Sequence, residues 1–334
     1  MEFGNQLAKS APRRLAVVTA SNLPTPAERV RAWWKKARRV YPHATLRAWR
    51  FDWVSFIAFC RPRGLLPLPA SPSTVAAYIE ACSDANKKPA TVRRYLSTIA
   101  CAHRAAKLQN PNDDEDVKLA LKGLYNKSPK RQRQAKALGW HQIKRFLIIA
   151  GEGIRADRER ALLSVAYDTM ARRSELVALD VKDFSWMEDG SGRVMIRRSK
   201  TDQVGQGSVA YLSQDTVVYL KAWLRASKIS KGAVFRRLIG KGRIGARLQV
   251  DAIAQTFKRV GEFVGMTADE TKDVSGHSIR VGATQDMLAL NIDLASVMQA
   301  GRWKTTAMPM RYGEEVQAGR GGMARTAKAQ GRAK

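Results

Sequence analysis

Seven side chains between residues 172 and 312 combine positive charge, hydrogen-bond donors and one phenol in a pattern suited to phosphate chemistry. A guanidinium group presents a planar fork of N–H donors to the oxygens of a phosphate, which a lysine cannot imitate. A tyrosine phenol is a potential nucleophile, but its ordinary pKa of about 10 means that it needs help to lose its proton at neutral pH. The candidate catalytic set is Arg172, Glu175, Lys200, His277, Arg280, Trp303 and Tyr312.

Other common catalytic motifs are absent from the sequence. It contains no HExxH zinc motif, no Walker A loop, no GxSxG elbow and no CxxC pair. With only four histidines, no metal site is expected. Cys60, Cys82 and Cys101 lie inside apolar stretches and are expected to be reduced core residues.

Taken singly, these side chains have ordinary structural interpretations. An arginine three residues before a glutamate, as in Arg172 and Glu175, is most often a solvated ion pair, and Lys200 alone is an ordinary turn lysine. His277 alone would be a buried structural histidine. Arg173 competes with Arg172 in register, although the spacing to Glu175 favours Arg172. The ordered set, rather than any one member, therefore carries the catalytic hypothesis.

Two strings give the set a family resemblance. AYDTMARRSELVALDVKDFS contains the first arginine, and SGHSIRVGATQDMLALNIDLASVMQAGRWKTTAMPMRY contains the histidine, second arginine, tryptophan and tyrosine. The sequence resembles the tyrosine recombinases, the phage integrase-like family, and within it the Cre-like branch. The resemblance is strong over residues 137–315 and weaker but collinear over 25–130.

The resemblance implies a site-specific recombinase that cuts and rejoins DNA through a 3′-phosphotyrosyl intermediate at Tyr312. Arg172 and Arg280 would bind the non-bridging phosphate oxygens, and His277 would accept or relay the phenol proton. Trp303 would donate its indole N–H where many relatives carry a second histidine. The resemblance assigns protonation of the leaving 5′ oxygen to Lys200 and a supporting, orienting role to Glu175. No metal, nucleotide or other cofactor is implied.

The composition predicts a folded protein that binds a polyanion. The 334 residues carry 59 Lys and Arg against 29 Asp and Glu, a formal net charge of +30, while 45% of residues are hydrophobic. Such a chain repels itself unless a polyanion neutralises it. Both 1–130 and 131–334 are basic, so DNA is expected to touch both domains. No membrane-length apolar run or signal-peptide core occurs, so we expect a cytoplasmic, nucleoid-associated protein in the bacterial, plasmid or phage context that the resemblance implies.

The pattern predicts a mainly α fold in two domains. A flexible arm at 1–24 precedes an all-helical core-binding domain at 25–125 and a basic linker at 126–136. A mostly helical catalytic domain with a small antiparallel β-sheet follows at 137–334, with a C-terminal interaction tail at about 318–334. Strands are expected at 181–186, 193–198 and 209–212, and only helices from 216 to the end.

The first domain is expected to contain helices from Thr25 to about 41, from 45 to 61, from Ser71 or Ser73 through Cys82, from about 89 through His103, and at 113–125. Thr25 and Glu28 have the spacing of a capping box. The apolar stripe of the second helix is predicted to comprise Leu46, Trp49, Trp53, Phe56, Ile57 and Cys60.

Basic side chains lie off the apolar stripes of the second and fourth predicted helices. The candidate DNA-binding residues are Arg47, Arg50, Thr91, Arg93 and Arg94, with a solvated helix face as the alternative. The resemblance points to the same two helices. It also implies, as partners, double-stranded DNA with an inverted-repeat site and a homotetramer on that DNA, with no membrane. His43, His103 and His141 are assigned to structure or surface.

Two rival functions remain open on the sequence alone. One uses a similar set of groups for strand transfer in a telomere resolvase or a type IB topoisomerase-like enzyme. The other is a catalytically silent DNA-binding architectural protein that keeps the fold and the charge. The completeness of the seven-residue set favours the enzyme.

Overall fold

The computed structural model describes residues 24–128, 133–197 and 206–333. Contacts divide the chain into two units, Met1–Gln132 and Arg133–Lys334. Both units are mostly helical and the strands are few and antiparallel, which confirms the predicted mainly α fold class. Residues 1–23 of the predicted arm at 1–24, residues 129–132 of the predicted linker, and Lys200 lie outside the described residues.

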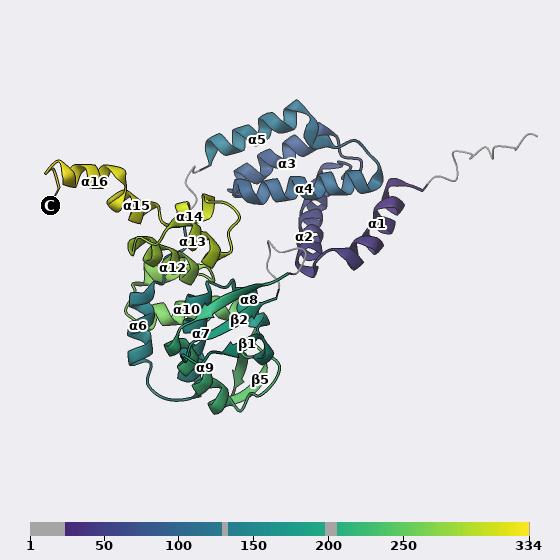
Figure 1. Ribbon diagram of the computed structural model, residues 1–334. Helices are drawn as coiled ribbons and strands as arrows, with labels where there is room; N and C mark the ends of the chain where they lie inside the picture. The colour runs from purple at the N-terminus through teal and green to yellow at the C-terminus, as the bar shows by residue number, and fades with distance from the viewer. Residues whose placement is uncertain (1–23, 129–132, 198–205, 334) are drawn as a thin grey trace, which may run out of the picture. The chain divides into compact units, whose positions relative to one another are not determined.

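Five α-helices account for most of the described part of the first unit (Figure 1). They are α1 (Pro26–Val40), α2 (His43–Cys60), α3 (Pro72–Asp84), α4 (Pro89–Ala106) and α5 (Glu115–Lys127), with short 3₁₀ helices at Arg61–Arg63 and Pro111–Asp113. The start of α1 has the predicted capping box: the Thr25 backbone N–H donates to Glu28 Oε2 at 2.8 Å, and the Glu28 backbone N–H donates to Thr25 Oγ1 at 3.3 Å. Helix α5 continues to Lys127, two residues into the predicted linker.

The core of the first unit lies where α2, α3, α4 and α5 meet. Phe56, Ile79 and Ile99 are fully buried there. Ile57, predicted on the buried stripe of α2, is instead exposed. Helix α2 buries residues four apart, namely Asp52, Phe56 and Cys60, so the next residue after Phe56 is rotated away from the core. Cys60 and Cys82 are buried and reduced as expected, whereas Cys101, also a free thiol, is only half-buried.

The second unit combines helices with a three-stranded sheet that is half-buried against them (Figure 1). The strands β1 (Phe184–Trp186), β2 (Gly192–Ile196) and β3 (Ser208–Leu212) pair antiparallel in the order β1-β2-β3, with Val194 opposite Ala210. The side chains of β2 alternate between buried and exposed, as a half-buried strand requires. Its helices are α6 (Trp140–Ile149), α7 (Ile154–Thr169), α8 (Arg173–Ala178), α9 (Gln214–Ser227), α10 (Val250–Phe263), α11 (Ala268–Asp273), α12 (Ser278–Ala289), α13 (Leu294–Gly301), α14 (Ala307–Tyr312), α15 (Glu314–Arg320) and α16 (Gly322–Ala329), with a 3₁₀ helix at Val181–Asp183.

Helix α7 is the central element of the second unit. It packs against α9 and β3 and also contacts α6 and α12. Leu162, Leu163 and Val165 are completely buried in it. Because helices cover α7 on several sides, its apolar residues do not form a single stripe. The helical period of the sequence predicts a helix at 158–170, and α7 begins four residues earlier, at Ile154.

A second hairpin lies in the region that was predicted to be entirely helical. Strands β4 (Arg236–Ile239) and β5 (Arg243–Arg247) pair antiparallel. Gly240 and Gly242 have φ values of 52° and 91°, which side chains with a Cβ rarely adopt. The expectation of helices only after residue 216 is therefore wrong, and these two glycines were the signal for the turn.

The end of the chain forms α15 and α16. Neither helix contains a buried residue. Helix α15 contacts α12, and the Arg320 guanidinium donates to the Ala289 carbonyl oxygen. Among the described residues, no helix is long and apolar enough to cross a membrane.

Candidate active site

Three segments of the second unit converge on the predicted catalytic residues. The first follows the end of α7, where Met170 has a φ of 47° and the chain turns into α8. Arg172 occupies the N-cap position of α8, so its side chain and Glu175 lie one helical turn apart. The second segment is the start of α12, with His277 and Arg280. The third runs from the end of α13 to the end of α14, with Trp303 and Tyr312.

The Glu175 carboxylate joins two of these segments. Arg172 Nη1 donates to Glu175 Oε1 at 2.8 Å, and the Arg172 backbone N–H donates to Oε2 at 2.9 Å. Arg302 Nη2 donates to the same Oε2, also at 2.9 Å. The Glu175 side chain is only 2% exposed. A buried carboxylate is stable only when it is well paired, and Glu175 has two guanidinium partners.

Arg280 is buried and fixed by backbone carbonyl groups. Its guanidinium donates to the carbonyl oxygens of Met170 and Gly301, the latter at 2.9 Å. Its guanidinium carbon also lies 4.8 Å from the centre of the Trp303 ring, a cation–π contact. Burial and the nearby charges of Arg172 and Arg302 lower the pKa of Arg280 to about 10, so the group remains charged at neutral pH. Because carbonyl groups fix it before substrate arrives, this charge is preorganised for an anion.

Trp303 contacts both Arg280 and Tyr312. The rings of Trp303 and Tyr312 meet edge to face, with centroids 5.9 Å apart and planes at 73°. The resemblance implied an indole N–H donor, whereas these contacts use the faces and edges of the ring. A Cβ at Gly301 would overlap the Trp303 ring, so the absence of a side chain at Gly301 lets the indole lie there.

Tyr312 is half-buried at the end of α14. Its backbone carbonyl oxygen accepts hydrogen bonds from Gln285 Nε2 at 3.0 Å and from Gln134 Nε2 at 3.4 Å. Burial raises the pKa of the Tyr312 phenol, and the positive charges of Arg280, Arg311 and Arg172 oppose that rise. The phenol therefore needs a proton acceptor before it can act as a nucleophile.

Two predicted site residues, His277 and Lys200, and the competing Arg173 remain to be placed. His277 is exposed at the N-cap of α12, three residues before Arg280. Lys200 lies outside the described residues. The competing Arg173 is exposed and its Nη1 lies 3.2 Å from Asp251 Oδ1, so Arg172 and not Arg173 joins the cluster. The structure thus brings together Arg172, Glu175, Arg280, Trp303 and Tyr312.

Sequence reasoning missed Arg302 and the two glutamines that hold the backbone of Tyr312. Arg302 precedes Trp303 directly in the string AGRW, and an arginine with a φ of 54° is unusual. The side-chain type and its place beside a candidate residue were visible in the sequence. The left-handed backbone was not, and it turns this side chain toward Glu175.

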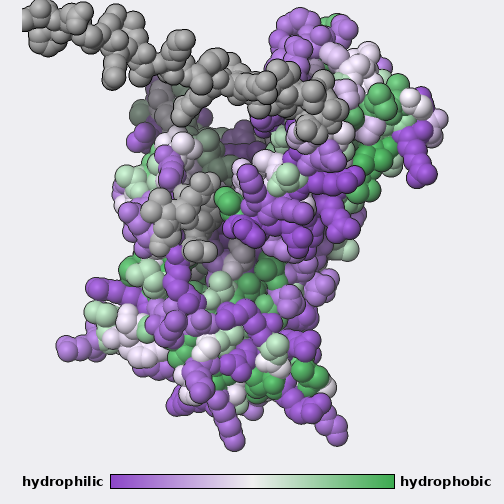
Figure 2. All heavy atoms as spheres, turned by 90° about the vertical axis from the view of Figure 1, so that its right-hand side faces the viewer, coloured by the Kyte–Doolittle hydropathy of each residue, from purple (hydrophilic) through white to green (hydrophobic). Residues whose placement is uncertain are grey.

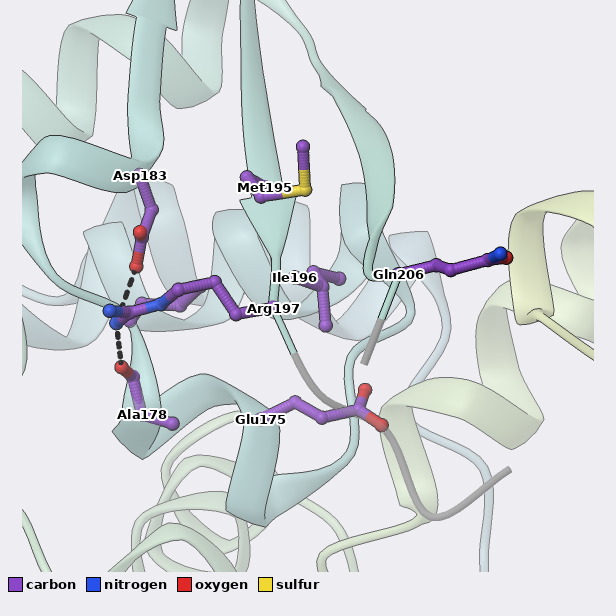
Figure 3. Close-up of a pocket in the computed structure, with 8 residues that line it drawn as sticks. Glu175, Ala178, Asp183, Met195, Ile196, Arg197 and Gln206 are labelled. Carbon is purple, nitrogen blue, oxygen red and sulfur yellow. Dashed lines mark hydrogen bonds and ion pairs between the residues drawn. The ribbon is translucent and has the colours of Figure 1, made fainter. Parts of the chain in front are cut away.

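A cavity of about 660 Å³ adjoins the cluster. It is lined by Glu175, Ala178, Leu179, Asp183, Met195, Ile196, Arg197 and Gln206. Figure 3 shows Arg197 at one side of it, where its guanidinium donates to the Ala178 carbonyl oxygen at 2.9 Å and pairs with Asp183 at 2.8 Å. The cavity lies between the end of α8 and the end of β2, next to Glu175.

The candidate DNA-binding residues of the first unit lie on two helices. Arg47 and Arg50 of α2 and Arg93 of α4 are exposed, and Thr91 is half-buried. Arg94 differs because its Nη2 lies 2.8 Å from Asp52 Oδ1, a buried carboxylate oxygen of α2. Thr98 Oγ1 donates to the other Asp52 oxygen at 3.1 Å. Arg94 therefore connects α2 to α4 as well as reaching solvent.

The three histidines outside the catalytic set, which were assigned to structure or surface, lie in the interior or at the surface, and the surface is rich in hydrophilic side chains. Hydrophilic side chains cover most of the face drawn in Figure 2. His103 is buried: its Nδ1 lies 2.8 Å from the Ile99 carbonyl oxygen, and the Ala70 N–H donates to its Nε2 at 3.0 Å. His43 and His141 are exposed. Within the described ranges no group of three or more His, Cys, Asp or Glu side chains is arranged to hold a metal ion.

Comparison with known proteins gives a consistent result. Residues 136–317, more than half of the chain, match the model of the phage integrase family. An integrase/recombinase XerD homolog of Selenomonas ruminantium is 28% identical over 282 residues, which are 81% of this chain and 81% of that protein. The recombinase Cre of Escherichia phage P1 is 25% identical over 287 residues, covering 81% of this chain and 84% of Cre.

Solved structures share the fold. The XerH site-specific recombinase, in a post-cleavage complex with a palindromic difH substrate, has a TM-score of 0.62 at 16% identity, over 93% of this chain and 85% of that one. A lambda integrase dimer bound to a COC′ core site has a TM-score of 0.54 at 17% identity, over 86% of this chain and 94% of that one. At these identities the structures show that the fold is shared, and the chemistry of this chain has to be inferred from its own residues.

Proposed function

Because this chain belongs to the phage integrase family of tyrosine site-specific recombinases, we propose that it cleaves and rejoins DNA strands through a covalent 3′-phosphotyrosyl intermediate. One observation carries the proposal: the buried Arg280 guanidinium lies over the Trp303 ring, which meets the ring of the half-buried Tyr312. The positive charges of Arg280 and of the largely buried Arg172 also oppose the rise in the pKa of that phenol. Cationic forks next to a phenol are what attack on a phosphodiester requires.

In the proposed reaction, the Tyr312 phenol oxygen attacks the scissile phosphorus. A new O–P bond to Tyr312 forms while the bond from phosphorus to the 5′ oxygen breaks, leaving the phosphate on the 3′ side of the nick. The phenol proton leaves toward His277, and Lys200 donates a proton to the departing 5′ oxygen. Attack by a second 5′ hydroxyl reverses these steps and restores a phosphodiester, so the bond energy is conserved throughout.

Arg172 and Arg280 stabilise the charge that develops on phosphorus. Each is held before substrate binds, Arg172 by Glu175 and Arg280 by the carbonyl groups of Met170 and Gly301. Preorganised donors of this kind are typically worth about 3 to 4 kcal/mol each in the transition state. The same positive charges favour the phenolate of Tyr312, which burial disfavours.

The test is a suicide DNA duplex carrying a sequence that the protein selects from random DNA. We expect a covalent adduct in which Tyr312 is esterified to a 3′ phosphate, and no adduct with Tyr312→Phe. Relaxation of supercoils at unselected sequences would indicate the topoisomerase-like function, and hairpin-ended products would indicate a telomere resolvase. Tight binding to the selected DNA without any adduct would contradict the enzyme and support an architectural DNA-binding protein.

We further propose that two inverted-repeat sites are joined by a homotetramer, with α16 as the contact between protomers. Helix α16 contains no buried residue, so its removal leaves the fold of the second unit intact. Deleting residues 321–334 keeps Arg320, which bonds to Ala289. This truncation should abolish pairing of two sites in a gel-shift assay while single-site affinity changes less than about threefold, a difference under 1 kcal/mol. Unimpaired pairing would remove α16 from the assembly.

A further inference from the structure

Glu175 has two guanidinium partners, and only one of them belongs to the predicted catalytic set. The second, Arg302, is the C-cap residue of α13 and has a φ of 54°. We propose that Arg302 is a positioning residue that neutralises the Glu175 carboxylate, so that the charges of Arg172 and Arg280 remain available to the scissile phosphate. This inference rests on the proposed function and names a further residue for the same reaction.

The Arg302 guanidinium is anchored at the end of α7. Its Nη1 donates to the Thr169 carbonyl oxygen at 2.8 Å, and its Nη2 donates to the Met170 carbonyl oxygen at 3.3 Å. The same Nη2 reaches Glu175 Oε2 at 2.9 Å, and the side chain is only 11% exposed. Arg302 and Arg280 therefore share the Met170 carbonyl oxygen as an acceptor. These contacts fix the position of the Arg302 guanidinium charge next to the Glu175 carboxylate.

The backbone at Arg302 carries a small conformational cost. A left-handed φ costs about 1 kcal/mol in a residue with a Cβ, and glycine adopts it freely. The chain nevertheless carries arginine at this position, directly between Gly301 and Trp303. The favourable ion pair with buried Glu175 offsets that cost.

The charges of the cluster explain what Arg302 contributes. Three guanidinium groups, of Arg172, Arg280 and Arg302, surround one carboxylate, Glu175, which leaves an excess of two positive charges. A phosphodiester carries one negative charge, and its pentavalent transition state carries close to two. Without Arg302, Glu175 would offset the charge of Arg172, and the excess would fall to one. Arg302 thereby matches the pocket to the transition state more than to the bound substrate.

The test is a double-mutant cycle with Arg302→Gln, Glu175→Gln and the combined variant. Single-turnover cleavage is measured on the suicide duplex at saturating DNA. R302Q should slow cleavage roughly 10- to 100-fold, because it leaves the Glu175 charge compensated only by Arg172. E175Q should slow wild-type cleavage, since it loosens Arg172. In the R302Q background, however, E175Q should speed cleavage roughly tenfold, because it removes the negative charge that offsets Arg172.

Several variants separate this effect from a loss of folding. Arg302→Lys keeps the charge and should cleave within about tenfold of wild type, since a lysine lacks the forked geometry but not the charge. Arg302→Gly removes the charge while relaxing the left-handed backbone, so it should be stably folded by thermal melting and still slow. Lys304→Gln removes one exposed charge from the same turn and should leave the cleavage rate unchanged at saturating DNA.

Each outcome bears on one claim. If R302Q and R302G cleave like wild type, or if the combined variant cleaves no faster than R302Q, Arg302 does not act by neutralising Glu175. If wild-type protein forms no adduct at all, the proposed function fails and this inference fails with it. An adduct that forms with wild type and is lost with Tyr312→Phe, together with speeding of R302Q by E175Q, supports both.

Discussion

Arginines cluster in two regions of this chain, and the two clusters differ in how far their side chains are buried and fixed. In the second unit, Arg172, Arg280 and Arg302 are largely buried, and carbonyl oxygens or one shared carboxylate fix them. On α2 and α4 of the first unit, by contrast, Arg47, Arg50 and Arg93 are exposed. Fixed, desolvated charge is suited to stabilising a transition state, whereas exposed charge is suited to salt-dependent attraction of a DNA backbone.

Arg94 lies between these two extremes. It is half-exposed, yet it pairs with the buried Asp52. Its presence in the first unit shows that an exposed arginine row can contain a structural member. Sequence type alone therefore does not separate catalytic, binding and structural arginines, and matched neighbouring pairs offer the sharpest tests.

The largest effect is expected from the adjacent pair Arg172 and Arg173. Arg172→Gln should slow single-turnover cleavage of the suicide duplex by about 10² to 10³-fold, because it removes a preorganised donor to the phosphate. Arg173→Gln should stay within about threefold of wild type, because Arg173 is an exposed partner of Asp251. An equal loss of cleavage rate in both variants would mean that the buried Arg172 and the exposed Arg173 do not differ in their contribution to the reaction.

The next effect concerns how closely Trp303 approaches the backbone. Gly301→Ala should slow cleavage by about tenfold or more and lower the free energy of unfolding by about 1 to 3 kcal/mol, because the added Cβ overlaps the indole. Gly319→Ala in α15 is the matched control, since a Cβ there meets nothing within 4 Å. Cleavage kinetics and thermal melting report the two consequences, and a G301A variant as active as G319A would show that Trp303 can move without harm.

A smaller, pH-dependent effect is expected from Arg94. Burial raises the pKa of Asp52, and the charge of Arg94 opposes that rise. A carboxyl group whose folded pKa exceeds its unfolded value of about 3.9 favours folding most at low pH and loses that contribution as pH rises through the folded pKa. Arg94→Gln raises this folded pKa further, so its deficit in stability should grow with pH.

Urea unfolding measures this deficit. Arg94→Gln should cost about 2 kcal/mol at pH 7.5 and markedly less at pH 4, because a protonated Asp52 needs no cation. Arg93→Gln, one residue away and exposed, should change stability by less than about 0.5 kcal/mol at either pH. A deficit for R94Q that is independent of pH would mean that the pair with Asp52 is not its cause.

The smallest effect per residue is expected at Arg47 and Arg50. If each neutralises one phosphate, each change to Gln should make the slope of log K against log salt shallower by about 0.9. Cleavage at saturating DNA should not change, because neither side chain belongs to the catalytic cluster. Lys118→Gln on α5, where Lys118 pairs with Glu115 at 2.7 Å, is the control for the loss of one surface charge. Unchanged salt slopes in the arginine variants would show that these side chains are a solvated face.

Much of the fold was predictable because local signals specify it. The capping box at Thr25 and Glu28 fixes the start of α1, and the alternation in β2 marks a half-buried strand. The helix corresponding to α7 was predicted, but its start was placed four residues late because it is buried on several sides and no single apolar stripe marks its first turn. The β4–β5 hairpin was missed because it depends on two glycines with positive φ in an arginine-rich stretch that lacks a clear strand pattern.

The sequence by itself determined which side chains are available and in what order, from Arg172 to Tyr312. Their order and spacing along the chain can be read without knowing how the chain folds. The spacing to Glu175 already favoured Arg172 over Arg173, and the contact between Arg172 and Glu175 agrees with it. Only the tertiary structure decided that Arg302 shares that carboxylate from 127 residues away. The physical reason is that burial and charge pairing depend on distances in space. A left-handed turn at one residue is enough to carry a distant guanidinium into the site.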